Sequence, residues 1–397
     1  MNQRTPDAMG EVGNSRPRVA LVSSSYAPYI GGVEEHVRQV ARELQADGVA
    51  VEVWTVDRGE SLGVRDAEGV IVRYLPTPLP ATSPGAALRF LVRLPSAWRR
   101  WAHAVRQFRP DLVHVHCFGP NGAYALALSR RFRLPLFITS HGETVADDHS
   151  VFARSALLRW ALRRGLSVAA QVTAPSQFVI DDLQANHDLV GGTVVPNGVV
   201  LDGDDGAEEL APKGRYLLGV GRLGRMKGFD LLIDAFAHAT LDRDIRLVIA
   251  GDGPEQTRLQ EAAEKLGLAA RIEFTGRLDA AAVARAMSNA IAVVVPSRME
   301  AFGIVALEAW RSGAPLVMTN RGGAPEFVRD GVDGVLVDAV DTVALAEAIS
   351  RVAGDEALRA ALTAAGLERV DEFTWERVAH AYEELYAAVS GRVEGRE

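Results

Sequence analysis

The chain contains little cysteine and no long apolar run. A single cysteine cannot form an internal disulfide, so nothing in the sequence indicates an oxidising compartment. The N-terminal segment from Met1 to Arg18 is polar and lacks the apolar core of a secretion signal. No stretch approaches the ~20 apolar residues that span a bilayer. We therefore expect a cytoplasmic protein, with peripheral contact at the inner face of the membrane left open.

An excess of positive charge is also missing. The net charge is −8, which argues against a nucleic-acid-binding protein. Only three of the 43 basic residues are lysine, a skew that is typical of codon bias, so clusters of arginine have less weight here. Apolar residues make up 48% and charged residues 24% of the chain, which is the composition of an ordinary globular protein.

The length and the pattern of the chain predict two α/β domains. At 397 residues the chain exceeds what one core usually supports. Short β-branched runs alternate with helical stretches, which is typical of parallel sheets. An acidic, glycine-rich stretch without periodicity interrupts the pattern. We predict a disordered tail over 1–17, a first Rossmann-like domain over 18–200, a linker over 201–214, a second such domain over 215–371 and a final helix over 372–390.

Local signals place some boundaries in the first domain. The segment Leu75–Gly85 contains four prolines and is predicted to be a loop. Helices are expected over Ala86–Phe108 and Ala153–Arg164. Strands are expected to be parallel, as in other alternating α/β sheets.

Two cations follow the predicted strand Tyr216–Val220. Arg222 and Lys227 lie in a glycine-rich loop at the carboxyl end of that strand, where parallel sheets bind ligands. Permanent side-chain cations suit a diphosphate. The loop also matches a dinucleotide fingerprint, but an NAD site needs an acid about 20 residues further on, and the nearest candidate, Asp252, lies beyond that distance. An NAD-dependent enzyme is therefore a weaker alternative.

Two carboxylates follow the predicted strand Ile291–Val295. Glu300 and Glu308 bracket the start of a helix near Phe302 and Gly303. Backbone N–H groups of Gly303, Ile304 and Val305 would face anionic oxygens there, and the helix dipole would add to the attraction. Carboxylates suit sugar and ribose hydroxyls. Together with the cations they indicate a nucleotide-sugar site.

The first domain offers weaker signals. Gly31 and Gly32 open a helix and would let the backbone approach a phosphate. His141 ends a strand, and an ordinary pKa near neutrality would let it donate to a sugar hydroxyl or a phosphate. His114 and His116 share one strand face. Because no third metal ligand is apparent, we interpret them as buried strand histidines.

The stretch 86–109 is basic and amphipathic. It has aromatic residues among its arginines and no acid. Such a helix can lie on an anionic membrane, so we expect possible partners to include a membrane surface. The arginines are Arg89, Arg93, Arg99, Arg100, Arg106 and Arg109.

Seven motifs in order make the chain resemble the family-4 retaining glycosyltransferases of the GT-B fold, which have two facing Rossmann-like lobes with a cleft between them. The resemblance extends from about Arg18 to about Ala388. It departs from the commonest family form at Ala301, where glycine is usual. The motifs are Gly31-Gly32, Ser140-His141-Gly142, Pro196-Asn197-Gly198, Arg222 with Lys227, Gly251 to Glu255, Glu300 to Glu308, and Gly322-Gly323.

The resemblance implies a reaction and a set of roles. The enzyme would transfer a sugar from a nucleotide-diphosphate donor to an acceptor with retention of configuration, without a metal or other cofactor. Arg222 and Lys227 would neutralise the diphosphate, and Glu308 would hold the ribose. His141, Glu300 and the segment from Gly303 to Val305 would hold the sugar, and Phe302 would belong to the donor-binding residues. The final helix would return to the first lobe.

Two further alternatives stay open beside this interpretation. One is a GT-B phosphorylase, although a pyridoxal-dependent one needs a Schiff-base lysine in a chain with only three lysines. The other is a nucleotide-sugar-binding protein without catalysis. The sequence does not identify the base, the donor sugar, the linkage, the oligomeric state or the acceptor, which could be a sugar, a lipid-linked molecule or a small molecule.

Overall fold

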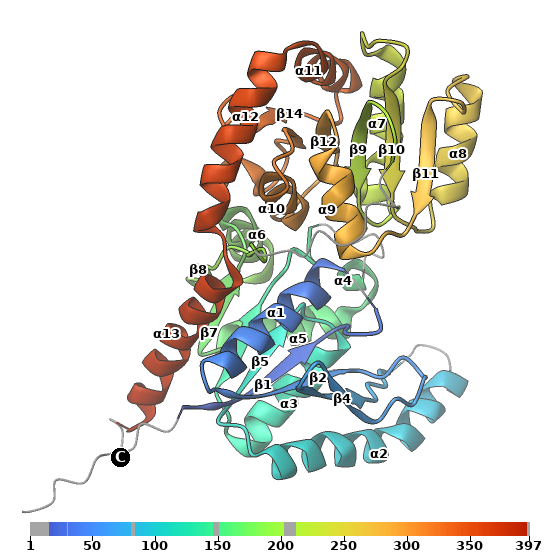
Figure 1. Cartoon of the computed structure of the whole chain (residues 1–397). Helices are drawn as coiled ribbons and strands as arrows, with labels where there is room; N and C mark the ends of the chain where they lie inside the picture. Colours follow the sequence, from blue (N-terminus) through green and yellow to red (C-terminus); the bar gives the residue numbers. More distant parts are fainter. Residues whose placement is uncertain (1–15, 30, 81–83, 146–150, 202–211, 395–397) are drawn as a thin grey trace, which may run out of the picture.

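The computed structural model describes residues 16–29, 31–80, 84–145, 151–201 and 212–394. These residues form two lobes, each built on one sheet with helices on both faces (Figure 1). The predicted tail, apart from its last two residues, and most of the predicted linker, residues 202–211, lie outside the described part of the chain. The predicted α/β fold with two Rossmann-like lobes is confirmed.

The N-terminal lobe contains an eight-stranded sheet in the order β3-β4-β2-β1-β5-β6-β7-β8. Its strands are buried on both faces: Ala20 and Val22 of β1 belong to one core, and Val19 and Leu21 to the other. This double burial explains the continuous apolar runs of the sequence. The strands are β1 (Arg18–Ser23), β2 (Ala50–Val56), β3 (Val64–Ala67), β4 (Val70–Leu75), β5 (Leu112–His116), β6 (Leu136–Thr139), β7 (Gln171–Ala174) and β8 (Thr193–Val194).

Six helices connect these strands. Helix α1 covers the face that holds Val19 and Leu21, while Ala97, Trp101 and Val105 of α2 pack on the face that holds Ala20 and Val22. The helices are α1 (Gly32–Ala46), α2 (Pro84–Phe108), α3 (Pro120–Phe132), α4 (Val151–Arg154), α5 (Ala156–Val168) and α6 (Gln177–His187).

The C-terminal lobe contains a six-stranded parallel sheet in the order β11-β10-β9-β12-β13-β14. The strands are β9 (Tyr216–Val220), β10 (Arg246–Ala250), β11 (Ile272–Gly276), β12 (Ala292–Val295), β13 (Leu316–Thr319) and β14 (Val335–Val337). The helices are α7 (Phe229–His238), α8 (Gln256–Lys265), α9 (Ala280–Ser288), α10 (Ile304–Arg311), α11 (Thr342–Gly354) and α12 (Glu356–Arg369), with short 3₁₀ turns at Arg225–Lys227, Ala324–Glu326 and Val370–Glu372.

Each sheet reverses its strand order at one point. In the N-terminal lobe β1 lies between β2 and β5, and in the C-terminal lobe β9 lies between β10 and β12. Loops that leave such neighbouring strands diverge to opposite faces and open a crevice beyond their carboxyl ends, where ligands of these sheets bind. The loops after β9 and β12 therefore frame the ligand-binding edge of the C-terminal lobe.

The chain passes between the lobes at two places, near Val199 and near Phe373, and these two segments lie side by side. Val199 donates its N–H to the carbonyl of Phe373 over 3.0 Å and pairs with Thr374 as a parallel bridge. A methyl group at Gly198 would lie 2.5 Å from the Thr374 carbonyl carbon, so only glycine fits between the crossings. After the second crossing, helix α13 (Trp375–Glu394) packs against α1 through residues such as Tyr382 (Figure 1).

Three local predictions were wrong. Strand β3 pairs antiparallel with β4 through a turn at Glu68 and Gly69, and its exposed, polar sequence hid it. Helix α2 begins at Pro84, inside the segment 75–85 that was predicted to be a loop, because proline is tolerated in the first turn of a helix.

The third error concerns the helix predicted over Ala153–Arg164. The helix is broken at Ser155, whose hydroxyl accepts the N–H of Leu158 and caps the start of α5. Within the described residues, no helix is long and apolar enough to cross a membrane.

Candidate functional site

Lys227 and Glu300 meet at the carboxyl ends of β9 and β12. The Lys227 ammonium nitrogen lies 2.7 Å from Glu300 Oε2, and the Ser297 hydroxyl donates to the same oxygen over 2.9 Å. The Glu300 side chain is 11% exposed, whereas that of Lys227 is 38% exposed. The sequence predicted Lys227 and Glu300 as separate contacts to a ligand. In the structure they form one ion pair, in which Lys227 is the accessible partner. Ser297 was not predicted, and its hydroxyl gives no sequence signal beyond its position after a strand.

The loops that hold this pair are locked together. A methyl group at Gly228 would lie 2.0 Å from the Pro296 carbonyl oxygen, and Gly228 has a φ of 68°. The Arg298 guanidinium binds both oxygens of Asp230 over 2.7 and 2.8 Å and pulls the second loop against the first. Bidentate pairs of this kind fix geometry as well as energy. The spacing of Lys227 and Glu300 is therefore set by the backbone.

A third loop supports Glu300 from the other side. The Glu300 N–H donates to the Arg321 carbonyl, and the Gly323 N–H donates to the Glu300 carbonyl, each over 3.0 Å. A methyl group at Gly322 would lie 2.0 Å from the Glu300 carbonyl oxygen. The glycines of the motif Gly322-Gly323 therefore allow the backbone of this loop to approach the backbone of Glu300 closely.

Helix α10 begins directly after the loop that carries Glu300, at the predicted place. Its N-cap, Gly303, has a φ of 97°, a conformation that favours glycine. The first N–H groups of a helix have no partner within the helix, so Ile304 and Val305 can offer theirs to an anion. Phe302 is buried and stacks on Phe327, with ring centroids 4.2 Å apart. Phe302 thus anchors the turn and does not line the crevice.

Glu308 lies one turn into α10. Burial raises the pKa of its carboxyl above the usual range, Arg311 opposes this shift, and Glu35 of α1 adds to it. Glu35 belongs to α1, so a carboxylate of the N-terminal lobe influences this carboxyl of the C-terminal lobe. No described residue makes a hydrogen bond to the Glu308 carboxylate, which leaves its oxygens open to donors such as ribose hydroxyls.

Two glycines of the N-terminal lobe approach the same region. A methyl group at Gly32 would lie 3.9 Å from Ile304 Cδ1, which places the start of α1 opposite the start of α10. Gly31 is the extended N-cap of α1. A methyl group at Gly142 would lie 2.5 Å from Ala301 Cβ. The unusual alanine at position 301 is accommodated because Gly142, directly after His141, has no side chain.

Glu143 holds the His141 loop in place. Its carboxylate accepts the N–H groups of His141 and Phe118 over 2.7 Å each, and the Ser140 hydroxyl over 3.0 Å. Burial raises the pKa of the Glu143 carboxyl, while these hydrogen bonds oppose the shift. Sequence reasoning did not assign Glu143, although its position in Ser140-His141-Gly142-Glu143 was a signal.

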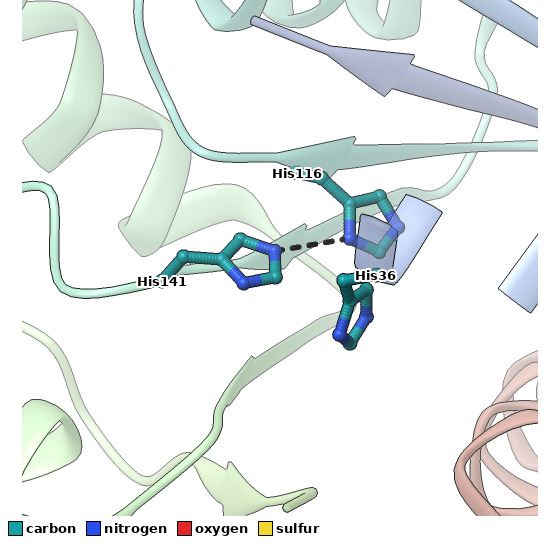
Figure 2. Close-up of side chains that lie close together, drawn as sticks. All are labelled: His36, His116 and His141. Atoms are coloured by element: carbon teal, nitrogen blue, oxygen red, sulfur yellow. Dashed lines mark hydrogen bonds between the residues drawn. The ribbon is translucent and has the colours of Figure 1, made fainter. Parts of the chain in front are cut away.

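His141 belongs to a cluster of four buried or half-buried imidazoles. Its Nε2 lies 3.3 Å from His116 Nδ1, and the His36 ring lies beside both (Figure 2). Burial holds the pKa of each ring well below its usual range, to about 4 for His36 and about 3 for His114. The expectation that His141 titrates near neutrality is therefore wrong, and it acts as a neutral imidazole.

The cluster corrects one prediction and agrees with another. His114 and His116 are buried, as expected of strand histidines. A third imidazole does come close, because ring nitrogens of His36, His116 and His141 lie within 4.8 Å of one another. However, both nitrogens of His36 are already hydrogen-bonded, to Asn197 Oδ1 over 2.8 Å and to the Tyr382 hydroxyl over 3.1 Å. Hydrogen bonds thus account for both nitrogens of His36, whereas the buried His116 Nε2 has no hydrogen-bond partner among the described residues.

Arg222 lies in the loop after β9 and is exposed. It makes no ion pair with any described residue. The structure places it on the same loop as Lys227 but does not bring it to Glu300.

Contacts between the lobes complete the region. The Ser176 hydroxyl donates to the Ala301 carbonyl over 2.6 Å. The Glu326 carboxylate accepts the N–H groups of Gln177 and Phe178, at the start of α6, over 2.6 and 2.7 Å. Glu326 follows the Gly322-Gly323 motif, so one segment of the C-terminal lobe contacts both Glu300 and the N-terminal lobe.

Two Rossmann-like lobes whose switch-point loops meet, with a cation–carboxylate pair on one side and imidazoles on the other, define a protein of the GT-B glycosyltransferase type. The sequence matches the family description Glycosyltransferase Family 4 over residues 30–202 and Glycosyl transferases group 1 over residues 204–369. The chain belongs to this family of glycosyltransferases, and the resemblance found in the sequence is confirmed.

Individual relatives cover nearly the whole chain. The phosphatidyl-myo-inositol mannosyltransferase of Mycobacterium leprae is 30% identical over 94% of this chain and 97% of its own. Sucrose-phosphate synthase from Thermosynechococcus elongatus has a similar structure, with a TM-score of 0.80, 25% identity and coverage of 95% and 100%. The Anabaena protein HepE, solved with UDP and glucose, has a TM-score of 0.73, 21% identity and coverage of 94% and 100%.

Proposed function

We propose that this glycosyltransferase moves a sugar from a nucleotide-diphosphate donor to an acceptor hydroxyl with retention of configuration and without a metal. The main observation that supports this proposal is the Lys227–Glu300 ion pair at the point where the strand order of the C-terminal lobe reverses. The solved complex of HepE with UDP and glucose, a protein of similar fold, supports a nucleotide-sugar donor.

When the donor binds, Lys227 and Glu300 would separate and contact different parts of it. The Lys227 ammonium group is accessible enough to turn to the diphosphate, where Arg222 of the same loop adds a second charge. Glu300, held by Ser297 and by the Gly322-Gly323 backbone, would then accept sugar hydroxyls. Charge aimed at a departing diphosphate is worth more in a water-poor crevice than in water.

The other residues would complete the donor site. The N–H groups at the start of α10, from Gly303 to Val305, would meet phosphate oxygens, and Gly31 and Gly32 face them from α1. The open Glu308 carboxylate would accept the ribose hydroxyls. His141, as a neutral imidazole positioned by Glu143, would donate one N–H to the sugar.

The positions of the charged groups support retention. In the proposed step the bond between sugar C1 and the diphosphate oxygen breaks, and its electron pair leaves with the diphosphate. The acceptor oxygen bonds to C1 on the same face, and its proton passes to the departing phosphate oxygen. An inverting reaction would need a general base on the opposite face. The imidazoles of the histidine cluster are poor candidates for that base, because burial lowers their pKa and makes them weak proton acceptors.

The anomeric configuration of the product tests this proposal. An α-linked donor is expected to give an α-linked product, identified from the anomeric proton by NMR. A β-linked product would contradict retention, although it would leave glycosyl transfer itself intact. A thermal-shift panel of nucleotide diphosphates and their sugars would identify the base, because a bound ligand raises the apparent stability by mass action.

Two alternatives make distinct predictions. A phosphorylase would release sugar phosphate when inorganic phosphate replaces the acceptor. A binding protein without catalysis would show thermal shifts but no turnover with any acceptor. The acceptor, whether a sugar, a lipid-linked molecule or a small molecule, would enter from the N-terminal lobe. The peripheral membrane contact proposed for residues 86–109 would not occupy the donor site, because α2 lies far from the C-terminal lobe (Figure 1).

A further inference from the structure

Ala301 of the C-terminal lobe lies inside the core of the N-terminal lobe. Its side chain is 5% exposed, and the other described members of the core in which it packs all belong to the N-terminal lobe. A methyl group added at Gly142 would lie 2.5 Å from Ala301 Cβ, whereas non-bonded carbon atoms pack at about 3.5–4.0 Å. The Ala301 methyl group therefore fills the space beside Gly142 and limits how closely the two segments can approach.

The backbone of Ala301 is held in this position from two sides. The Ser176 hydroxyl, directly before α6, donates to the Ala301 carbonyl over 2.6 Å in a buried position. A methyl group at Gly323 would collide with the same carbonyl oxygen, so the loop that supports Glu300 packs against Ala301 as well. Movement of Ala301 away from Gly142 would break a buried hydrogen bond and is therefore costly.

The two residues in contact each follow a residue that the proposed function assigns to the donor sugar. Glu300 precedes Ala301, and His141 precedes Gly142. The backbone of Glu300 is hydrogen-bonded through both its N–H and its carbonyl, and the His141 N–H donates to the Glu143 carboxylate over 2.7 Å. Because both segments are fixed in this way, the contact between Ala301 and Gly142 sets the separation of Glu300 and His141 across the lobe boundary.

We infer that the Ala301 methyl group sets the width of the sugar subsite between Glu300 and His141, and thereby determines which donor sugars fit. This inference rests on the proposed function, which assigns both residues to the sugar. Ala301 is a positioning residue, because it acts through Glu300 and need not touch the sugar. One methylene group more or less in a pocket changes discrimination between ligands by about 10- to 200-fold. A spacer of one methyl group is therefore large enough to decide specificity.

Calorimetric titration of the full chain and of Ala301→Gly tests the inference. UDP, GDP and ADP would each be titrated alone, as the glucose derivative and as the N-acetylglucosamine derivative. Relative to the glucose derivative, Ala301→Gly should bind the N-acetylglucosamine derivative about 10-fold more weakly than the parent does, because a narrower subsite excludes the larger substituent. Affinity for the nucleotide diphosphate alone should not change, because the proposed diphosphate contacts, Lys227 and the start of α10, do not involve Ala301.

Two further variants separate the spacing from a general loss of stability. Ala301→Ser adds one atom at the contact, so it should raise the relative affinity for the N-acetylglucosamine derivative. The matched control is Ala339→Gly, the same substitution at a fully buried position in a core of the C-terminal lobe. It should lower the melting temperature as Ala301→Gly does, but it should leave the ratio of the two affinities unchanged.

Crystal structures of the parent and of Ala301→Gly measure the spacing itself. The distance between the Cα atoms of Glu300 and His141 should decrease by about 1 Å, which is less than one carbon–carbon bond because packed surroundings relax only partially. An unchanged distance would overturn the inference. If the parent binds a nucleotide sugar but Ala301→Gly has the same ratio of affinities, the inference alone is overturned. If the parent binds none of these nucleotides, the proposed function fails and the inference fails with it.

Discussion

The two lobes offer opposite chemistry at the carboxyl ends of their strands. The C-terminal lobe presents the charged groups Lys227 and Glu300, which are paired with each other and partly accessible. The N-terminal lobe presents the imidazoles of His116 and His141, which burial keeps neutral. The same fold therefore supports a pair of charged groups in one lobe and a group of neutral hydrogen-bonding side chains in the other. The difference lies in how much water reaches each loop, since burial penalises charge unless it is paired.

Lowering the pH should have the largest effect, because it tests whether the buried imidazoles of the N-terminal lobe stay neutral. The pKa of His36 is about 4 and that of His114 about 3 in the folded protein, against an ordinary value of 6.5. A lowered histidine pKa means that the unfolded chain binds more protons, so stability is full above pH 6.5 and falls as the pH decreases towards 4. At pH 5 the two rings together should reduce the free energy of unfolding by roughly 4 kcal/mol.

Glu308 of the C-terminal lobe should act with the opposite sign. Its pKa is raised in the folded protein, so its contribution is present below its ordinary value of 4.5 and is lost as the pH rises above it. Between pH 6.5 and 4.5 the two effects oppose each other, and the histidines dominate because four rings with lowered pKa values titrate against this carboxyl. Urea denaturation at pH 7.5, 6 and 5 measures the effect. Replacement of His114 by Gln should flatten the pH dependence, and an unchanged slope would show that the cluster titrates normally.

Loss of the cation on the C-terminal side should give the next largest effect. Lys227→Ala should lower the rate of transfer about 10²-fold or more, because one electrostatic contact to the leaving group disappears. Steady-state kinetics with a nucleotide sugar measures it. Arg222→Ala should also lower the rate by about 10²-fold. Lys265→Ala, at the exposed end of α8, is the matched control and should leave kcat and KM unchanged. Normal rates in both site variants would remove the proposed role of the loop.

Weakening the contact between the two lobes at Glu326 should have a smaller effect. Glu326→Gln weakens the two charge-assisted hydrogen bonds to Gln177 and Phe178, and at this exposed position we expect a cost of about 1 kcal/mol in lobe closure. Small-angle scattering should show a larger radius of gyration without loss of secondary structure. Glu347→Gln, an exposed carboxylate on α11, should behave like the parent. An identical scattering curve for Glu326→Gln would show that the lobes are held by other contacts.

Removal of divalent metal should have no effect. The proposed mechanism uses Arg222 and Lys227 where other enzymes use a cation, so transfer should continue in EDTA at the parent rate. Activity that disappears in EDTA and returns with Mg²⁺ or Mn²⁺ would contradict the mechanism. It would also direct attention to the His36–His116–His141 cluster, whose nitrogens lie within 4.8 Å of one another.

Predictions from the sequence were accurate where the residue pattern of a single segment is enough to define a strand or a helix start. Strand β9 has the predicted bounds, and the helix start near Gly303 lies where expected. Lys227 and Glu300 were singled out because each lies in a loop that follows an apolar strand. Strand β3 and the break at Ser155 were missed because a polar strand and a mid-helix cap give little periodic signal.

Contacts between distant segments could not be predicted in this way. The pairing of Lys227 with Glu300 depends on β9 and β12 being neighbours, which follows from the strand order. His36 joins His116 and His141 from a different element, so its pKa had no local signal. Ala301 was an anomaly in the sequence, and only the approach of Gly142 explains it.

The sequence by itself determined most of the elements, the loops with charged residues and the family, because hydrophobic periodicity and glycine-rich turns are local properties of the chain. The tertiary structure decided which charges are paired, which histidines stay neutral and which residues meet between the lobes. These properties depend on burial and on partners far along the chain. Desolvation and pairing energies are set by the packed surroundings of a residue and not by its sequence neighbours.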